Sequence, residues 1–577
     1  MKRTGTLLLA LFLGVYLAAH CEASTNFYVD PDWGGVQTGT ASQPWNALNA
    51  TAWSSINTAL ANGDVTIYFS ALKADGTQQS RAWFVQCRRI DYGPNRLTLD
   101  GYSFYNSSET SPNWLANPEP DIAVAYTGGK VFRITGDGSM ALGWTRGDGN
   151  DFVAHNGLVY CCIESHLASA DNEPGVGSNW QLYWDQHGTS GSAWSSGTTY
   201  KCYVKQNNIT IRGFELTGSG ARGGVNGDNL IWEYNYIHDI TNLDPGLRVL
   251  YTSAPDSSAA QIISRPSTNM TFRDFRIERT MGEAFYLGSI NPDSPASFQL
   301  AHGNQHSHIV IENFVISQPG INGAQGDGID AKNGITYLTI RLGDISGFGN
   351  GEANGINIGY SATNVDQHIL VETVFIHDPA TYDNTGGHFG IFAETGGSCC
   401  PSLYGYNGVT IRNNVVANTR RGITFAGSTN QPATYGYIYN NTIYNTSPDS
   451  GLGVAINVSN TVVKNNFVFG GANPSGLIGA SGVVSDYNAH DGSWSSPSEG
   501  LHTLALTNSQ ALAAVVDAAN GDFHPSATSA LKRNALTISG FSDDFYQRPR
   551  APGNWNIGAV QVNGDVSAVP CDLQVVP

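Results

Sequence analysis

The sequence predicts an all-β solenoid, a coil of short parallel strands stacked rung upon rung. Two observations carry this prediction. The chain has 577 residues, more than a single compact core usually holds, and only 13% of them are charged. Short β-type segments also recur from about residue 207 onward, at a spacing of roughly 20 to 35 residues that is typical of repeat architectures.

The recurring segments have the composition of strands that end in tight turns. Each alternates apolar with polar residues and holds Asn, Asp or Gly at its bend. Examples are NNITIRGFEL (207–216), HIVIENFVIS (308–317) and GVTIRNNVVANT (408–419). Asparagine pairs at the bend, such as Asn413 with Asn414, predict ladders of stacked side-chain hydrogen bonds inside the coil.

A second family of strands lies between these segments. Its members are GEAFYLG (282–288), GDGIDAK (326–332), ANGINIG (353–359), HFGIFAE (388–394), RRGITFA (420–426) and GLGVAIN (451–457). Alternation predicts that Ile329 and Ala331 face the core, so that their neighbours face outward in columns. Rungs of a parallel sheet lie about 4.8 Å apart, so side chains in one column can share a ligand.

Aligning these stretches gives the candidate site. One column holds Glu283, Asp327, Asn354, Phe389, Arg421 and Leu452; the next holds Tyr286, Asp330, Asn357, Phe392, Thr424 and Ala455; a third holds Lys332 and Glu394; and Tyr360 lies nearby. Charged residues are scarce in this chain, so their crowding on one face is informative. A face lined by acids and aromatic rings suits a glycan.

The chain resembles the right-handed parallel β-helix proteins of the pectate-lyase-like superfamily over roughly residues 25–140 and 205–565. FYVDPDWGGVQTGTASQPWNAL near the start and DFHPSATSALKRNA with FYQRPRAPGNWNIGAVQV near the end carry this resemblance, together with the rungs. DGIDAK is similar to a stretch of calcium-dependent pectate lyases, in which Asp327 would match a calcium ligand. The next rung, EANGIN, departs from their paired-acid segment.

Two chemistries fit the columns. In a β-elimination on a uronate polymer, the resemblance and the residues assign Glu283, Asp327 and Asn354 to Ca²⁺, Lys332 to the base and Arg421 to the uronate carboxylate. In a hydrolysis, Asp330 and Glu394 form the carboxylate pair. Tyr286, Asn357, Tyr360 and Phe392 would line the substrate. The alternative without catalysis is a glycan-binding surface protein, in which Asp327 and Asp330 only satisfy turn backbone.

Residues 142–202 interrupt the repeat. They contain, in order, Trp144, Gly147, Asp148, Val153, Gly157, Tyr160, His166, Pro174 and Trp180. This order is similar to that of small chitin- or cellulose-type carbohydrate-binding modules. Trp144 and Trp180 are the expected sugar-stacking residues, with Trp184 and Trp194 as further candidates. The competing interpretation is that these tryptophans form the core of a small insertion. Cys161 or Cys162 could bridge to Cys202 and close it. The full division is a signal peptide (1–23), first rungs (24–141), the insertion (142–202), the main β-helix (203–500) and a closing segment (501–577).

The first 23 residues have the layout of a secretory signal peptide, with Lys2 and Arg3 before an apolar run. We therefore expect an extracellular or periplasmic monomer without a membrane-spanning segment. The seven remaining cysteines predict disulfides in an oxidising compartment. The net charge of −18 argues against a nucleic-acid partner, which needs a basic face. It also opposes a polyanionic substrate unless local cations offset it.

Overall fold

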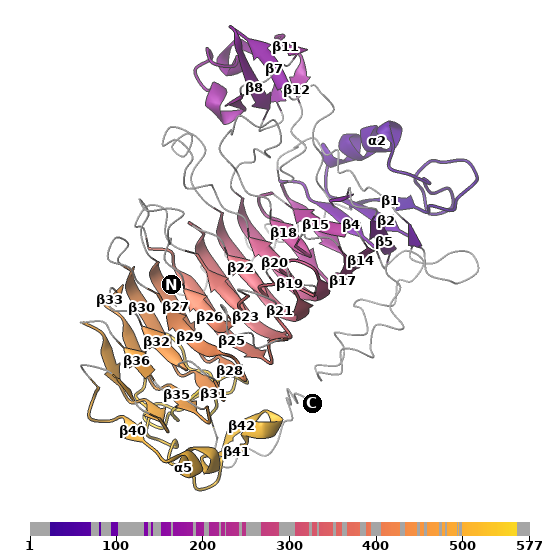
Figure 1. The fold of residues 1–577 in the computed structure, drawn as a ribbon. Coiled ribbons are helices and arrows are strands. Elements are labelled where there is room, and N and C mark those ends of the chain that lie inside the picture. Colours follow the sequence, from indigo (N-terminus) through magenta and orange to yellow (C-terminus); the bar gives the residue numbers. More distant parts are fainter. Residues whose placement is uncertain are drawn as a thin grey trace, which may run out of the picture.

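The computed structural model is a right-handed parallel β-helix, which confirms the predicted fold class (Figure 1). Parallel strands stack along one axis and the chain coils around it, with a small separate sheet at one end of the view. The structure describes residues 24–70, 80–81, 94–101, 132–136, 140–141, 152–162, 166–187, 192–200, 207–218, 221–225, 227–241, 245–249, 267–287, 306–321, 326–331, 334–349, 353–359, 366–380, 388–393, 406–426, 433–446, 451–454, 458–471, 476–478, 482–492, 494–495 and 499–561.

The larger sheet, which has 23 strands within these ranges, is folded along its length into two panels that we call the first and second panel. The first panel holds β1 (Thr25–Val29), β2 (Val65–Phe69), β4 (Leu97–Asp100), β13 (Ile209–Arg212), β16 (Ile231–Glu233), β27 (Asn407–Arg412), β30 (Ala433–Tyr439), β33 (Val458–Ser459), β34 (Val462–Lys464) and β37 (Val484–Asp486). The second panel holds β3 (Ser80–Arg81), β5 (Phe132–Gly136), β14 (Phe214–Gly218), β17 (Tyr236–Ile240), β28 (Val415–Ala417), β31 (Thr442–Tyr444), β35 (Phe467–Phe469), β38 (Ala489–His490) and β40 (Leu504–Ala505).

Four long strands run through both panels and bend at the crease: β19 (Thr268–Thr280), β21 (Ser307–Pro319), β23 (Thr336–Ser346) and β25 (Ile369–His377). The crease residue of each adopts a left-handed conformation, as at Asp274 (φ 54°) and Asn313 (φ 50°). Asparagine and aspartate tolerate this conformation better than most residues do. The crease therefore explains the short polar residues in the middle of β19 and β21, whereas β23 and β25 have Leu342 (φ 56°) and Thr373 (φ 57°) at this position.

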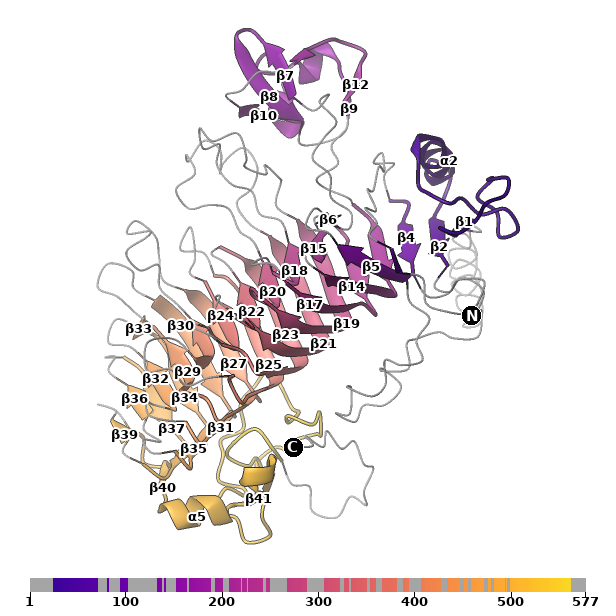
Figure 2. The ribbon, with the colours of Figure 1, turned by 45° about the vertical axis from the view of Figure 1, so that its right-hand side comes forward.

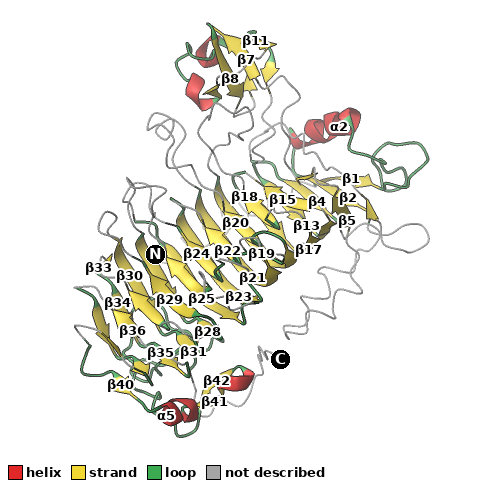
Figure 3. Cartoon of the chain, in the orientation of Figure 1, coloured by secondary structure: helices red, strands yellow, loops and turns green. Residues whose placement is uncertain are grey.

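The narrow sheet, with 11 strands among the described residues, closes the coil (Figure 3). Its strands are β6 (Met140–Ala141), β15 (Ala221–Val225), β18 (Leu247–Val249), β20 (Phe285–Leu287), β22 (Ile329–Ala331), β24 (Ile356–Ile358), β26 (Phe389–Ala393), β29 (Arg421–Phe425), β32 (Leu452–Val454), β36 (Gly476–Ile478) and β39 (Trp494–Ser495). The two panels and the narrow sheet enclose one continuous apolar core, and Ile329 and Ala331 belong to it as predicted.

Buried asparagines hold the crease of the later rungs together. Asn414 Oδ1 accepts the Val374 N–H at 3.0 Å, and Asn441 Oδ1 accepts the Asn414 N–H at 3.0 Å. Asn466 and Asn488 continue the series in the same way. All four asparagines are fully buried, so each amide satisfies backbone groups that water cannot reach. The predicted asparagine ladder is thus present.

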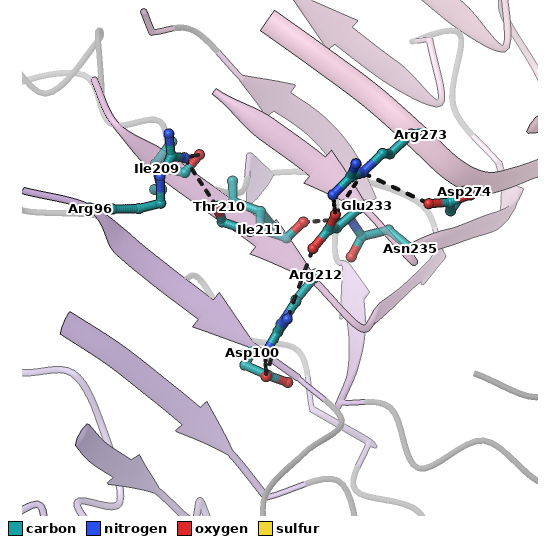
Figure 4. A network of polar contacts seen from close by, with 10 residues as sticks. All are labelled: Arg96, Asp100, Ile209, Thr210, Ile211, Arg212, Glu233, Asn235, Arg273 and Asp274. Atoms are coloured by element: carbon teal, nitrogen blue, oxygen red, sulfur yellow. Dashed lines mark hydrogen bonds and ion pairs between the residues drawn. The ribbon is translucent and has the colours of Figure 1, made fainter. Parts of the chain in front are cut away.

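The outer face of the first panel carries a column of alternating charge. Asp100, Arg212, Glu233, Arg273, Glu312, Arg341, Glu372 and Arg412 follow one another on successive rungs. Figure 4 shows its first part, where Arg212 bonds Asp100 at 2.6 Å and Arg273 bonds Glu233 at 2.6 Å. We call this column the ion-pair column.

The two ends of the coil have different covers. At the start, α2 (Ala50–Leu60) contributes Ala52, Trp53 and Ile56 to the main core. At the other end, the chain folds back over the second panel as α5 (Asn508–Ala513), β41 (Val515–Asp517) and β42 (Asp522–Pro525). There its apolar side chains cover outward-facing residues such as Phe375 and Phe467. No helix within the described ranges is long and apolar enough to cross a membrane.

The region predicted as an insertion forms small sheets of its own at the top of Figure 2. They comprise β7 (Phe152–His155), β8 (Leu158–Cys162), β10 (Trp184–His187) and β11 (Ser192–Ala193), and separately β9 (His166–Leu167) with β12 (Thr199–Tyr200). Trp184 is fully buried and its indole N–H donates to the Asn172 carbonyl at 2.9 Å. The prediction that Trp184 stacks on a sugar is therefore wrong, because this side chain belongs to the core of the insertion.

The other residues of the insertion have mixed outcomes. Trp180 and Trp194 are half-buried, and Trp180 packs edge-on against Tyr160 at 5.4 Å between ring centroids. Cys162 is buried, and its sulfur lies 3.9 Å from His166 Nδ1. The bridge from Cys161 or Cys162 to Cys202 stays a prediction, because Cys202 is not among the described residues. Trp144, Cys202 and the Cys161 side chain lie outside the described part of the chain.

Candidate active site on the narrow sheet

The outer face of the narrow sheet brings one predicted column into register. Tyr286 pairs with Asp330, Asp330 with Asn357, Asn357 with Phe392 and Phe392 with Thr424. These side chains therefore follow one another along the helix axis at the strand spacing of about 4.8 Å. We call this the site column.

Glycines place the site column close to the rest of the coil. A Cβ at Gly328 would lie 2.5 Å from the Gly355 carbonyl oxygen and 2.6 Å from Ile345 Cγ2 of β23. Gly355 and Gly390 occupy the equivalent position on the next rungs, with Ile376 and Val416 as their counterparts. Only glycine allows the chain to turn this tightly against the second panel, so the repeated Gly-Ile pair fixes the register of the residues around it.

Asp330 lies at the centre of the site column and is fully buried. Asn357 Nδ2 donates to Asp330 Oδ1 at 3.3 Å, and Tyr286 occupies the preceding rung. The sequence predicted an outward-facing residue. Asp330 does point away from the apolar core, but it is not exposed to solvent, and neither is Asp327. A buried carboxylate costs free energy unless its oxygens are hydrogen-bonded or paired, so its position is specified by its neighbours.

The neighbouring column contains the three predicted calcium ligands. Asp327 Oδ1 accepts the Asn354 N–H at 2.5 Å, and Asn354 Oδ1 accepts the Phe389 N–H at 3.2 Å. Glu283 is half-buried on the rung before Asp327, and its carbonyl accepts the Gly246 N–H. Asp327 and Asn354 thus each support the backbone of the following rung, which is the structural role that the sequence also allowed.

Aromatic rings and an arginine continue this face. The rings of Phe389 and Phe392 stack at 4.3 Å between centroids and 20° between planes. The Arg421 guanidinium lies over the Phe389 ring, 4.8 Å from its centroid. Phe389 is nearly buried, whereas Phe392 and Arg421 remain partly exposed. The predicted substrate-facing residues Tyr286 and Phe392 are therefore both accessible in part.

One residue of the site column was not predicted. Arg248 of β18 pairs with Tyr286, and its guanidinium lies 5.2 Å from the centroid of the Tyr286 ring. The site column thus begins with a cation and continues with a ring, an acid, an amide and a second ring. The stretch GLRV at 246–249 has the same Gly-apolar pattern as the other rungs, which was the available signal.

Several predicted site residues cannot be placed. Lys332, Tyr360 and Glu394 lie outside the described residues. Lys332 and Glu394 directly follow β22 and β26, and Tyr360 comes two residues after the end of β24. At the last predicted rung the register is wrong. Leu452 pairs with Ile423 and lies in the core, and Gly453 rather than Ala455 pairs with Thr424. The prediction aligned Gly453 with Gly422, whereas Gly451 has that position.

No family model matches the chain, and no curated protein matches it in sequence. Among solved structures it is similar to pectate lyase Pel9A (12% identity, 95% of this chain and 98% of that chain, TM-score 0.40). It is also similar to a rhamnogalacturonan lyase (14%, 80% and 84%, TM-score 0.35) and to a GH136 lacto-N-biosidase from Eubacterium ramulus (11%, 87% and 71%, TM-score 0.40). At these identities the likeness concerns the fold alone.

Proposed function

We propose that the protein is a polysaccharide-degrading enzyme whose active site lies on the outer face of the narrow sheet. The observation that carries this proposal is the site column itself, in which Arg248, Tyr286, Asp330 and Asn357 follow on consecutive rungs. An extended polymer that runs along the helix axis would meet a cation, an aromatic face and a carboxylate in turn. This combination is suited to binding a sugar and to moving a proton.

The first choice of reaction is β-elimination on a uronate-containing polymer. Arg248 and Arg421 stand on either side of Asp330 on this face, and each could pair with a uronate carboxylate. Neutralising that carboxylate makes the adjacent C5 proton easier to remove. The electrons of the C5–H bond then form a C4–C5 double bond, the C4–O bond breaks, and the departing oxygen takes up a proton.

Lys332 is the proposed base of this reaction. It follows Asp330 by two residues, so in a continuing strand it would be on the same side of the narrow sheet. Tyr286 carries a hydroxyl beside Asp330 and is the proposed donor to the departing oxygen. The net charge of −18 opposes a polyanionic substrate, so the two arginines would have to offset it locally.

Calcium remains part of the proposal, at Glu283, Asp327 and Asn354. These residues supply the hard oxygen atoms that Ca²⁺ prefers. Asp327 Oδ1 and Asn354 Oδ1 already accept backbone N–H groups. Asp327 would therefore offer its second carboxylate oxygen to the ion, whereas Asn354 would have to use the second lone pair of Oδ1. The arrangement fits a site in which the ion also steadies the turn between rungs.

A glycoside hydrolase is the second candidate. Hydrolysis by this route needs one carboxylic acid and one carboxylate across the scissile bond. Asp330 and Glu394 are the proposed pair, because Asp330 lies at the centre of the site column and Glu394 directly follows β26, two rungs further on. A non-catalytic glycan-binding protein is the third candidate, and it predicts binding without new chain ends.

One assay separates the three candidates. The purified protein is incubated with pectin, alginate, xylan, galactan and cellulose, with and without a chelator, while absorbance of the unsaturated uronate and reducing ends are followed together. A lyase raises both signals, and a hydrolase raises reducing ends alone. If neither signal rises on a polymer that the protein binds, the enzyme proposal is wrong.

We propose that the chain is exported after removal of residues 1–23 and acts as an extracellular or periplasmic monomer.

We also propose that the insertion binds glycan through Trp144 and Trp180, of which Trp180 is half-buried. A pull-down on insoluble cellulose and chitin, with Trp180→Ala compared with the unchanged protein, tests glycan binding by the insertion. Equal retention of both proteins would contradict it.

A further inference from the structure

The corner at which each coil enters the first panel carries a column of residues in left-handed conformation. Successive rungs place Asn208, Asn229, Asn269, His308, Tyr337, His368, Gly408, Tyr435 and Asn460 there, with φ between 49° and 75°. Because the backbone conformation repeats, the side chains leave the coil in similar directions. What each rung presents to solvent at this corner then depends on the residue type alone.

Three of these side chains form a stack of rings. His308 and Tyr337 are 4.5 Å apart between ring centroids with planes 9° apart, and Tyr337 and His368 are 4.6 Å apart at 23°. Each ring face inside the stack is covered by its neighbour. Among the described residues of this column, the outer face of His308 looks toward Asn269, and the outer face of His368 looks toward Gly408 on the next rung.

Gly408 leaves a gap of one side chain in the column. The following rung carries Tyr435, which is 49% exposed and continues the same backbone conformation. Two rungs separate His368 from Tyr435, so their rings stand about 10 Å apart. That separation is twice the observed stacking distance and leaves room for one further ring between them. We call this gap the aromatic slot.

A carboxylate lies at the base of the aromatic slot. Asp366 Oδ1 accepts the His368 N–H at 3.1 Å and lies 3.6 Å from His368 Nδ1. A side chain at Gly408 would collide with this oxygen, so the carboxylate occupies the position from which a side chain would start. The Asp366 side chain is 51% exposed and the His368 side chain 49%, which makes the base and one wall of the slot accessible.

We propose that the aromatic slot is a second glycan-binding site, which takes one neutral sugar ring between His368 and Tyr435 with its hydroxyl groups on Asp366. Aromatic faces suit the C–H faces of a sugar, and a carboxylate accepts hydrogen bonds from hydroxyls. The choice of a sugar as occupant rests on the proposed function. The slot lies at an outer corner of the coil, apart from the site column, and would hold a polymer chain beside the enzyme rather than cleave it.

The charge at the base of the slot argues against an acidic sugar. A uronate would place its carboxylate beside Asp366 and be repelled. An organic cation would be attracted by the rings and by Asp366, so choline is the comparison that separates a cation from a neutral sugar in the test.

The test measures binding of neutral oligosaccharides by saturation-transfer NMR titration of the full-length protein. The probes are cellohexaose, xylohexaose and mannohexaose, with a galacturonate hexasaccharide and choline for comparison. Tyr435→Ala removes one wall of the slot, and we expect it to weaken binding of at least one neutral probe by about fivefold. The matched control is His308→Ala, which removes an exposed ring from the other end of the same stack and should leave the affinity unchanged.

Three outcomes would overturn the proposal. The first is that Tyr435→Ala and the unchanged protein bind every neutral probe with equal affinity. The second is that Tyr435→Ala loses affinity for choline alone. The third is that Tyr435→Ala loses as much affinity for the galacturonate probe as for the neutral probes. Cleavage is measured on the same samples with the polymer panel. Cleavage without a Tyr435 effect rejects the slot alone, whereas a Tyr435 effect without cleavage rejects the enzyme proposal alone.

Discussion

The outer faces of the first panel and of the narrow sheet use charge in opposite ways. On the first panel, Glu233 has Arg212 on one side and Arg273 on the other, at 4.0 Å and 2.6 Å. On the narrow sheet, Asp330 has Tyr286 on one side and Asn357 on the other. Both acids are buried, but only Glu233 has a cation on each neighbouring rung.

This difference separates charges that stabilise the coil from charges that are available for chemistry. Opposite charges on adjacent rungs neutralise each other, and most of their interaction energy offsets the cost of desolvation. The Asp330 carboxylate instead accepts a hydrogen bond from the Asn357 amide and has Tyr286 on the preceding rung, while the cations Arg248 and Arg421 stand further along the face. We therefore expect substitutions on the two faces to differ in kind: loss of activity on one, loss of stability on the other.

The largest expected effect is on activity. Asp330→Ala should lower the rate of polysaccharide cleavage. In the hydrolase alternative Asp330 belongs to the carboxylate pair, and loss of a side chain that transfers a proton costs about a hundredfold or more. In the elimination it lies between the proposed donor Tyr286 and Asn357, so its loss should disturb the centre of the site. Reducing ends and unsaturated products are measured as before. Glu312→Gln, on the ion-pair column, is the matched control: it also removes one acid from an outer face but should keep full activity. Equal rates for the two variants would remove Asp330 from the site.

The next effect is on stability. Glu233→Gln removes the charge shared by Arg212 and Arg273, and we expect a loss of about 2 kcal/mol. The loss is below that of a fully buried pair because the Arg273 side chain is 42% exposed. Calorimetric melting measures it, with cleavage as the control. A variant that melts like the unchanged protein but cleaves more slowly would reverse the assignment of the two faces.

A third outer face adds a dependence on pH. Burial alone would lower the pKa of His377 on the second panel, but hydrogen bonds to Asp344 and Asp378 outweigh it and raise the pKa to about 9. Protonated His377 therefore stabilises the fold below about pH 6.5, and this contribution is lost as the pH rises to about 9. Its size is at most about 3 kcal/mol.

The His377 effect is measured by melting the protein at pH 6, 7.5 and 9. The unchanged protein should lose stability over this range. His377→Asn should start lower at pH 6 and fall by less. Parallel curves for the two proteins would mean that another group carries the dependence.

The smallest effect belongs to the exposed part of the ion-pair column. Arg341 bonds Glu312 at 2.6 Å, but its side chain is 44% exposed. Exposed pairs contribute about 0.2 to 1 kcal/mol, and salt screens them. Arg341→Ala should therefore cost less than about 1 kcal/mol, and the difference should shrink in 1 M salt. If Arg341→Ala lost as much stability as Glu233→Gln, burial would not determine how much each residue of the ion-pair column contributes to stability.

The sequence predicted the repeat and most of the register because the rungs of β22, β24, β26 and β29 each contain a glycine that the packing requires. Gly328 and Gly355 both precede an isoleucine, and aligning them places Asp330 beside Asn357 correctly. The alignment slipped at residues 451–454, where two glycines offer two registers and side-chain alternation is the same in both. Arg248 was missed although its rung has the same Gly-apolar pattern at 246–249 and its strand is as long as β20, β22 and β24.

The burial of Asp327 and Asp330 could not be predicted from alternation. Alternation says which side of a sheet a residue faces, whereas burial depends on segments that are distant in sequence. The ion-pair column, by contrast, was present in the sequence, since Arg212, Glu233 and Arg273 end equivalent segments. Recognising it needs the register first, because the opposite charges are neighbours only after the chain has completed a coil.

The alternation of charge on the first panel limits how this coil could change in length. The pattern repeats every two rungs, so inserting or deleting one rung would set two like charges about 4.8 Å apart at the junction. Two rungs together would leave every pairing intact. Near its end the column has Tyr439 between Arg412 and Lys464, a neutral residue where an acid would continue the series. The charge pattern of the first panel is therefore kept only when rungs are added or removed two at a time.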